Sequence, residues 1–160
     1  YQEGDIQLLH SVGFNGQSIS YINPNIVTKN RDLINKYKIK ISIMIPQGGE
    51  TGVQPANGYR SISGPQILNP GVVDTFSYLN VAFFDTEIEA KNFLNFLIGK
   101  FARYMMRTTF SSVHLSKNNF IFVPAMDFKE QWTDEKLYKY FELDDHEIEL
   151  IENTMRVIEL

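Results

Sequence analysis

The longest amphipathic pattern in the chain spans residues 86–107 and determines what the rest of the fold must provide. Thr86 or Asp85 can cap its first turn, and Arg103 and Arg107 stand in its last turn, where a helix dipole favours cations. Its apolar residues fall within one arc at 100° per residue: Ala90, Phe93, Leu94, Leu97, Ile98, Phe101 and Met105. We therefore predict one long helix that packs this stripe on a sheet.

Several shorter patterns predict strands. Residues 38–43 alternate polar and β-branched apolar side chains, which is typical of a strand buried on one face only. Further strands are predicted at 66–69 and 75–84, separated by a Pro-Gly turn, and at 120–123, before Pro124. The first 28 residues, with short apolar runs between Gly, Asn and Ser, also predict short strands and turns.

Short helices are predicted after three capping residues. Asn30 can begin a helix of about two turns, Thr133 a second short helix, and Asp144 or Asp145 a third that extends to Met155. The expected fold class is α+β: a small mixed or antiparallel sheet packed by one long amphipathic helix, with a C-terminal helical tail. We expect residues 1–126 to form the core, and residues 127–160 to form an acidic helical extension on the same domain.

The charge of the chain is divided unevenly along it. Net charge is −4, which argues against binding to nucleic acid, because phosphate contacts require clustered cations. Residues 1–126 nevertheless carry 11 Lys and Arg against 8 Asp and Glu, whereas residues 127–160 carry 4 against 11. Exposed charges separated by more than about 10 Å are largely screened, so the first part could still present a positive face.

Catalytic signatures are missing from the sequence. Cysteine is absent, and His10, His114 and His146 lack the spacing of metal ligands. The glycine-rich residues 47–52 lack the Gly-Lys-Ser/Thr ending of a P-loop, and neither a nuclease trio nor a methyltransferase Asn-Pro-Pro-Tyr loop occurs. We therefore expect this chain not to be an enzyme, and to bind no metal or cofactor.

The beginning of the chain and its apolar runs bear on location. Tyr1 stands where an initiator Met would be expected, and no signal-peptide pattern follows, so we expect a piece of a longer protein. The apolar runs fall far short of the roughly 20 residues that cross a bilayer. A soluble, cytoplasmic protein without a membrane partner is the expectation.

Two features suggest a binding function. Lys100, Arg103 and Arg107 follow i, i+3, i+7 spacing and would form a basic ridge, unless this is an ordinary solvated face. The long loop 46–65 contains five Gly, three Pro and side chains able to pair with base edges, unless it is simply a polar loop. The candidate DNA-binding residues are Lys40, Gln47, Gln54, Asn57, Arg60, Lys100, Arg103, Arg107 and Lys117.

The C-terminal third carries a resemblance to a known family. Residues 120–128 (FIFVPAMDF), 132–143 (WTDEKLYKYFEL) and 147–152 (EIELIE) resemble the closing segment of bacterial restriction-modification adenine-specific DNA methyltransferases. Weaker similarity extends the resemblance to about residues 36–155. The chain departs from the family at Gly99, which stands where Thr is frequent, and at Phe141-Glu142, where a Tyr-Gly pair is common.

The resemblance implies a target-recognition region that lies C-terminal to an S-adenosylmethionine-dependent adenine-N6 methyltransferase, often one fused to an endonuclease. S-adenosylmethionine, and Mg²⁺ where a nuclease is present, would be bound by the parent chain. The expected partners are double-stranded DNA and the catalytic domains. A second hypothesis is a protein-interaction domain that docks on the catalytic part through Trp132, Tyr138, Tyr140 and Phe141, unless these aromatics pack in the core.

Overall fold

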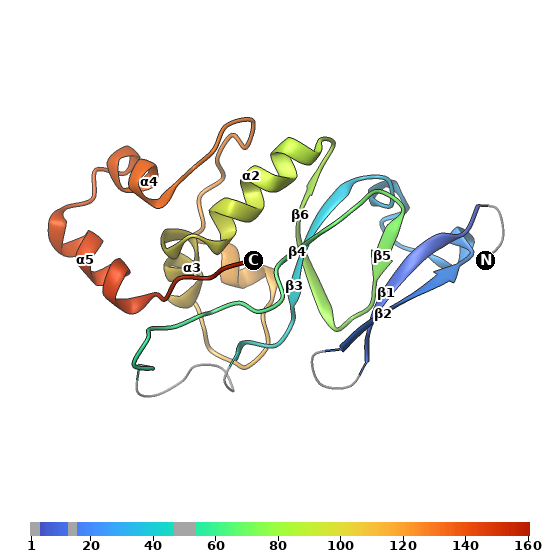
Figure 1. The fold of residues 1–160 in the computed structure, drawn as a ribbon, viewed down its shortest axis with the longest axis horizontal. Coiled ribbons are helices and arrows are strands. Elements are labelled where there is room, and N and C mark those ends of the chain that lie inside the picture. The colour runs from blue at the N-terminus through green and yellow to red at the C-terminus, as the bar shows by residue number, and fades with distance from the viewer. Residues whose placement is uncertain (1–3, 13–15, 47–53) are drawn as a thin grey trace.

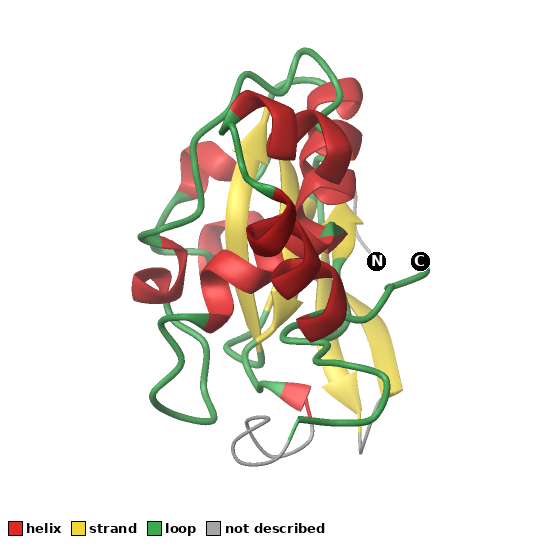
Figure 2. Ribbon diagram, turned by 90° about the vertical axis from the view of Figure 1, so that its left-hand side faces the viewer, coloured by secondary structure: helices red, strands yellow, loops and turns green. Residues whose placement is uncertain are grey.

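The computed structural model describes residues 4–12, 16–46 and 54–160. Two three-stranded sheets lie at one end of the molecule, and the helices gather at the other (Figure 1). Figure 2 shows the helices in front of the sheets when the molecule is turned. The fold class is α+β, as the sequence predicts, although the strands form two small sheets and not one.

The first sheet has the strand order β2-β1-β5. Strands β1 (Ile6–Val12) and β2 (Gly16–Ile22) pair antiparallel, and β5 (Val72–Asp74) runs parallel to β1. The short strands predicted for the first 28 residues are therefore confirmed. Leu9 is the buried residue among the described residues of this sheet, so it contributes little to the core.

The second sheet has the strand order β4-β3-β6. The central strand β3 (Tyr37–Ser42) pairs antiparallel with β4 (Gln66–Leu68) and with β6 (Tyr78–Phe84). The prediction that only one face of β3 is buried is wrong, since Lys38 and Lys40 are 4% and 1% exposed. Burial is possible because backbone carbonyls surround the Lys38 ammonium group, and the Lys40 ammonium group lies 4.2 Å from the centre of the Tyr78 ring.

Three local predictions also need correction. The strand predicted at 75–84 begins only at Tyr78, because the Tyr78 amide first closes a turn onto the Thr75 carbonyl. Residues 120–123 are no strand: a 3-10 helix at Lys117–Phe120 precedes a turn, and the Asn119 side chain fixes that helix. The helix predicted after Asn30 is a single 3-10 turn, Arg31–Leu33, and Asn30 does not cap it because its φ is +53°.

The predicted long helix is two helices, α2 (Glu87–Ile98) and α3 (Lys100–Arg107), separated at Gly99. Thr86 caps α2, and this helix packs on all three strands of the second sheet. The apolar stripe is confirmed along α2, where it is buried at Ala90, Phe93, Leu94 and Leu97. The chain bends at Gly99, whose ψ of 155° is extended and ends the helical hydrogen bonding.

A carboxylate from the C-terminal extension causes this break. Helix α4 (Asp134–Tyr140) begins with Asp134, whose two carboxylate oxygens accept hydrogen bonds from the backbone amides of Lys100 (2.8 Å) and Phe101 (3.0 Å). Asp134 thus caps α3 from another helix, since Gly99 has no side chain to do so. A Cβ atom on Gly99 would lie 2.7 Å from an Asp134 carboxylate oxygen, so only glycine leaves room for this cap.

The C-terminal extension belongs to the same hydrophobic cluster as α2 and α3. Thr133 caps α4 and Asp144 caps α5 (Asp145–Thr154), as predicted. The buried side chains that the extension adds to the cluster are Trp132, Leu137, Tyr138, Ile151 and Ile158. Among the described residues, no helix is long and apolar enough to cross a membrane.

We predict that Gly99→Ala lowers the free energy of unfolding by about 1–3 kcal/mol, because the new methyl group displaces the Asp134 cap from α3. Asp134→Ala should cost about 1–2 kcal/mol by removing the same cap. Urea unfolding measures both, and Asn95→Ala, on the exposed side of α2, is the control with an expected change under about 0.5 kcal/mol. A Gly99→Ala protein as stable as the parent would contradict this account of the break.

Candidate nucleic-acid interface

Arg103 is fully buried and bonds to backbone carbonyls from three parts of the chain. Its Nε atom donates hydrogen bonds to the carbonyls of Ile98 (2.9 Å) and Gly99 (3.1 Å). The Nη1 atom donates to the carbonyls of Tyr59 (3.4 Å) and Arg60 (3.0 Å), and the Nη2 atom donates to the Arg156 carbonyl (2.6 Å). The prediction that Arg103 stands on an exposed basic ridge is therefore wrong. The helical hydrogen bonding ends at Gly99, and Arg103 donates back to the carbonyls of Ile98 and Gly99 at this break.

Two segments far apart in sequence meet on Arg103. The Tyr59 amide donates to the Thr154 carbonyl (2.8 Å), and the Arg156 amide donates to the Tyr59 carbonyl (3.1 Å), so Tyr59 and Met155 form a parallel bridge. The preceding Gly58 has a φ of +78°, and a Cβ there would lie 2.8 Å from the Thr154 carbonyl oxygen. The described part of the predicted loop 46–65 is thus fixed on the core: Tyr59 and Ile62 are buried.

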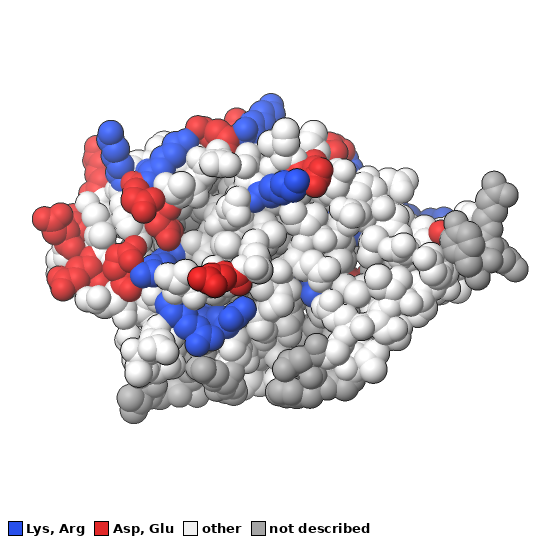
Figure 3. Space-filling view, in the orientation of Figure 1, with Lys and Arg blue, Asp and Glu red and all other residues white. Residues whose placement is uncertain are grey.

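Three partly exposed arginines gather around this junction, and we call them the arginine patch: Arg60, Arg107 and Arg156. The Cζ atom of Arg107 lies 3.1 Å from the centre of the Tyr59 ring, so the guanidinium stacks on a side chain whose backbone is fixed. Figure 3 shows a cluster of Lys and Arg side chains below the C-terminal segment. Sequence reasoning missed Arg156, although it is the sole arginine of the acidic residues 127–160.

Two of the three arginines of the patch come from stretches of sequence without acidic residues, whereas Arg156 stands between Glu152 and Glu159. Residues 51–73 and 90–126 contain no Asp or Glu, yet they include Arg60, Arg107 and the exposed Lys117. Acidic side chains concentrate instead over α4 and α5, at the left of Figure 3. The separation of charges is partial, because Figure 3 shows an acidic side chain directly above the basic cluster.

The remaining candidate DNA-binding residues are scattered. Lys100 is bound within the protein, since its ammonium group donates to the Glu152 carboxylate (2.6 Å) and to the Glu152 carbonyl (3.2 Å). Gln54 donates to the Asn153 carbonyl (2.7 Å) and Asn57 is exposed, whereas Lys40 lies in the core. Gln47 lies outside the described residues.

Buried charges also connect the two sheets. The Asp74 carboxylate on β5 accepts two hydrogen bonds from the Asn80 amide on β6 (2.9 and 3.1 Å), close to Lys38 and Lys40. Burial raises the pKa of Asp74 and lowers the pKa of both lysines, for Lys38 to about 8, while attraction between the opposite charges opposes each shift. This cluster joins the sheets and is too deeply placed to contact DNA.

Comparisons with known proteins add no further information. The chain matches no family model, no curated protein and no solved structure. The likeness to restriction-modification methyltransferases therefore depends on the residues quoted above. Within residues 4–12, 16–46 and 54–160, no three His, Asp or Glu side chains are grouped so that they could hold a metal ion.

We predict that Arg103→Met destabilises the protein by about 3 kcal/mol or more, because several buried carbonyls lose a charged donor at once. The stability of Arg103→Lys should fall between those of Arg103→Met and the parent, since an ammonium has fewer donors in a different geometry. Thermal and urea unfolding measure the effect. Lys91→Met, at an exposed ion pair with Glu87, is the control and should change stability by less than about 1 kcal/mol. Equal stability of Arg103→Met and the parent would contradict the buried position of Arg103.

We predict that Lys38 makes the protein more stable as pH rises from about 8 to 10. The pKa of Lys38 is about 8 in the folded protein and 10.5 in the unfolded chain. Between these values the unfolded chain binds more protons than the folded protein, so the free energy of unfolding increases as the pH rises. The free energy of unfolding, measured by urea at several pH values, should rise less steeply in Lys38→Met. Parallel pH profiles for the two proteins would contradict a buried, easily deprotonated Lys38.

Proposed function

We propose that this chain recognises double-stranded DNA in a sequence-specific manner, as the target-recognition part of a restriction-modification adenine-N6 methyltransferase or endonuclease. The observation that carries the proposal is the arginine patch, three partly exposed arginines gathered where residues 59–60 are hydrogen-bonded to the segment after α5. The C-terminal resemblance supports the same function. In this proposal catalysis and S-adenosylmethionine binding belong to other parts of the parent chain.

The residues of the patch suit two different tasks. Arg60 and Arg156 lie on two backbone segments that are hydrogen-bonded side by side. In this proposal their side chains contact neighbouring phosphates. Arg107 is stacked on Tyr59, which fixes the plane of its guanidinium and favours the paired hydrogen bonds that recognise a guanine edge. Arg103 takes a positioning role, because it holds the backbone of both segments and need not touch DNA.

This assignment changes the list of DNA-contacting residues. Lys40, Lys100 and Arg103 leave it, since the first and third are buried and the second is paired with Glu152. Arg156 joins it. Arg60, Arg107, Asn57 and Lys117 remain, with Asn57 placed just before the fixed Tyr59. In this proposal Arg156 contacts phosphate from the end of the acidic extension, while the carboxylates of α4 and α5 face away from the DNA.

We predict that Arg60→Gln and Arg156→Gln each weaken binding to every duplex. Each should also make the negative slope of log affinity against log salt less steep by about 1, as the loss of one phosphate contact requires. Fluorescence anisotropy with labelled duplexes over a salt series measures this. Lys139→Gln removes a charge of the same sign from exposed α4 and is the matched control, with no expected change in slope. Absence of DNA binding even at low salt would refute the proposed function.

A second candidate function is docking on the catalytic part of the same system. Two of the four aromatics of the extension, Trp132 and Tyr138, are buried, as core packing requires. Tyr140 is 61% exposed and Phe141 39% exposed, which leaves an aromatic surface beside the acidic residues. A chain that binds no duplex at any salt concentration would leave docking as the favoured function.

A further inference from the structure

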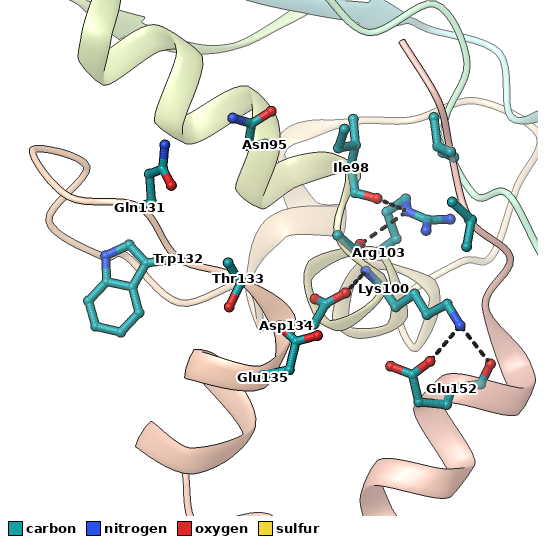
Figure 4. A pocket seen from close by; sticks show the side chains of 13 residues that line it. Asn95, Ile98, Lys100, Arg103, Gln131, Trp132, Thr133, Asp134, Glu135 and Glu152 are labelled. Atoms are coloured by element: carbon teal, nitrogen blue, oxygen red, sulfur yellow. Dashed lines mark hydrogen bonds and ion pairs between the residues drawn. The ribbon is translucent and has the colours of Figure 1, made fainter.

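A pocket of about 490 Å³ lies between the end of α2, the start of α3, residues 131–135 and the C-terminal segment (Figure 4). Such a volume is within the usual range for ligand sites. Its apolar wall consists of Ile98, Val157 and Ile158. Polar side chains line the remainder, and Figure 4 shows Asn95 and Gln131 above Asp134 and Glu135.

Several polar groups of this pocket already have partners within the protein. The Asp134 carboxylate caps α3, and the Lys100 ammonium group is held by Glu152. Glu152 also accepts a hydrogen bond from the Tyr138 hydroxyl (2.7 Å). Arg103, the other cation of the lining, is occupied by backbone carbonyls. Neither cation of the lining is therefore placed to hold an anionic ligand.

Three other polar side chains of the lining make no such contacts. Asn95, Gln131 and Glu135 are exposed, and their side chains form no hydrogen bond or ion pair with any residue that the structure describes. All three carry an oxygen acceptor. Each therefore offers an acceptor to a ligand at no cost in existing contacts.

The charge around the pocket is negative. Its lining contains the carboxylates Asp134, Glu135 and Glu152 against the cations Lys100 and Arg103, which leaves a formal charge of −1. Burial raises the pKa of the Tyr138 hydroxyl, and its hydrogen bond to Glu152 and the negative charges of these carboxylates raise it further. A phosphate would be repelled here, which disfavours nucleic acid and favours a cation.

We propose that this pocket binds the arginine side chain of a basic protein segment. A guanidinium has five N–H donors in a planar fork, so it can donate to the Glu135 carboxylate and still offer N–H groups to other acceptors of the lining. The aliphatic part of the arginine would lie on Ile98 and Val157. Lysine fits less well, because its ammonium has three donors instead of five and cannot form the paired hydrogen bonds that a guanidinium makes with a carboxylate. This proposal does not depend on DNA recognition by the arginine patch.

The test uses the full chain and its single tryptophan, since Trp132 lines the pocket and reports on it by fluorescence. The probes are short blocked peptides that differ only in carrying arginine, lysine or glutamate. We expect the arginine peptide to change the Trp132 emission and to bind more tightly than the lysine peptide, and the glutamate peptide not to bind. Equal binding of arginine and lysine peptides, or none by either, would overturn the proposal.

Two variants and a matched control locate the binding. Glu135→Gln should weaken the arginine peptide about 5–10-fold, and Asn95→Leu should weaken it while leaving the net charge unchanged. Glu149→Gln removes the same charge from an exposed site on α5 outside the pocket, and should leave affinity within about twofold. Circular dichroism checks that each variant is folded. Equal weakening by Glu135→Gln and Glu149→Gln would mean general attraction to the acidic extension, and would overturn the pocket assignment.

Discussion

The buried guanidinium of Arg103 is the constraint on which the arrangement of this molecule depends. A charged group without solvent must find hydrogen-bond acceptors, and Arg103 finds them in the backbone of three separate segments. Those segments are the junction of α2 and α3, residues 59–60 and residue 156. Because backbone carbonyls are the acceptors, Arg103 fixes the main chain at Arg60 and at Arg156. One buried arginine thus determines where two partly exposed arginines lie.

The first residue of α3 makes a second connection of this kind. Its amide is capped by Asp134 on α4, while its side chain is held by Glu152 on α5. The acidic extension therefore uses some of its carboxylates to attach itself to the core. The remaining carboxylates give the extension its negative surface.

Sequence reasoning succeeded where the cause was local and failed where it was distant. Thr86, Thr133 and Asp144 cap their own helices, so those helix starts could be predicted from neighbouring residues. The break at Gly99 could not, because Asp134 causes it from another part of the chain. The helical spacing of Arg103 predicted an exposed ridge, and this prediction was wrong because the groups that bury Arg103 are also distant in sequence. Its acceptors lie on segments that no helical periodicity can identify, and Arg156 became a candidate only when those segments were seen together.

The separation in sequence between Arg103 and its acceptors has a consequence for motion. Residues 60 and 156 stand 43 and 53 positions from Arg103 along the chain, whereas the amides of α2 are bonded within one helix. Contacts between distant segments cost more loop-closure entropy than bonds within a helix, so we expect the junction to form after the helical bonds of α2. The Tyr59–Met155 bridge should then open as one unit, with the amides of Tyr59 and Arg156 exchanging their hydrogens together, while those of α2 stay protected. The lifetime of the arginine-bearing surface would then depend on the bonds that Arg103 makes to the two segments.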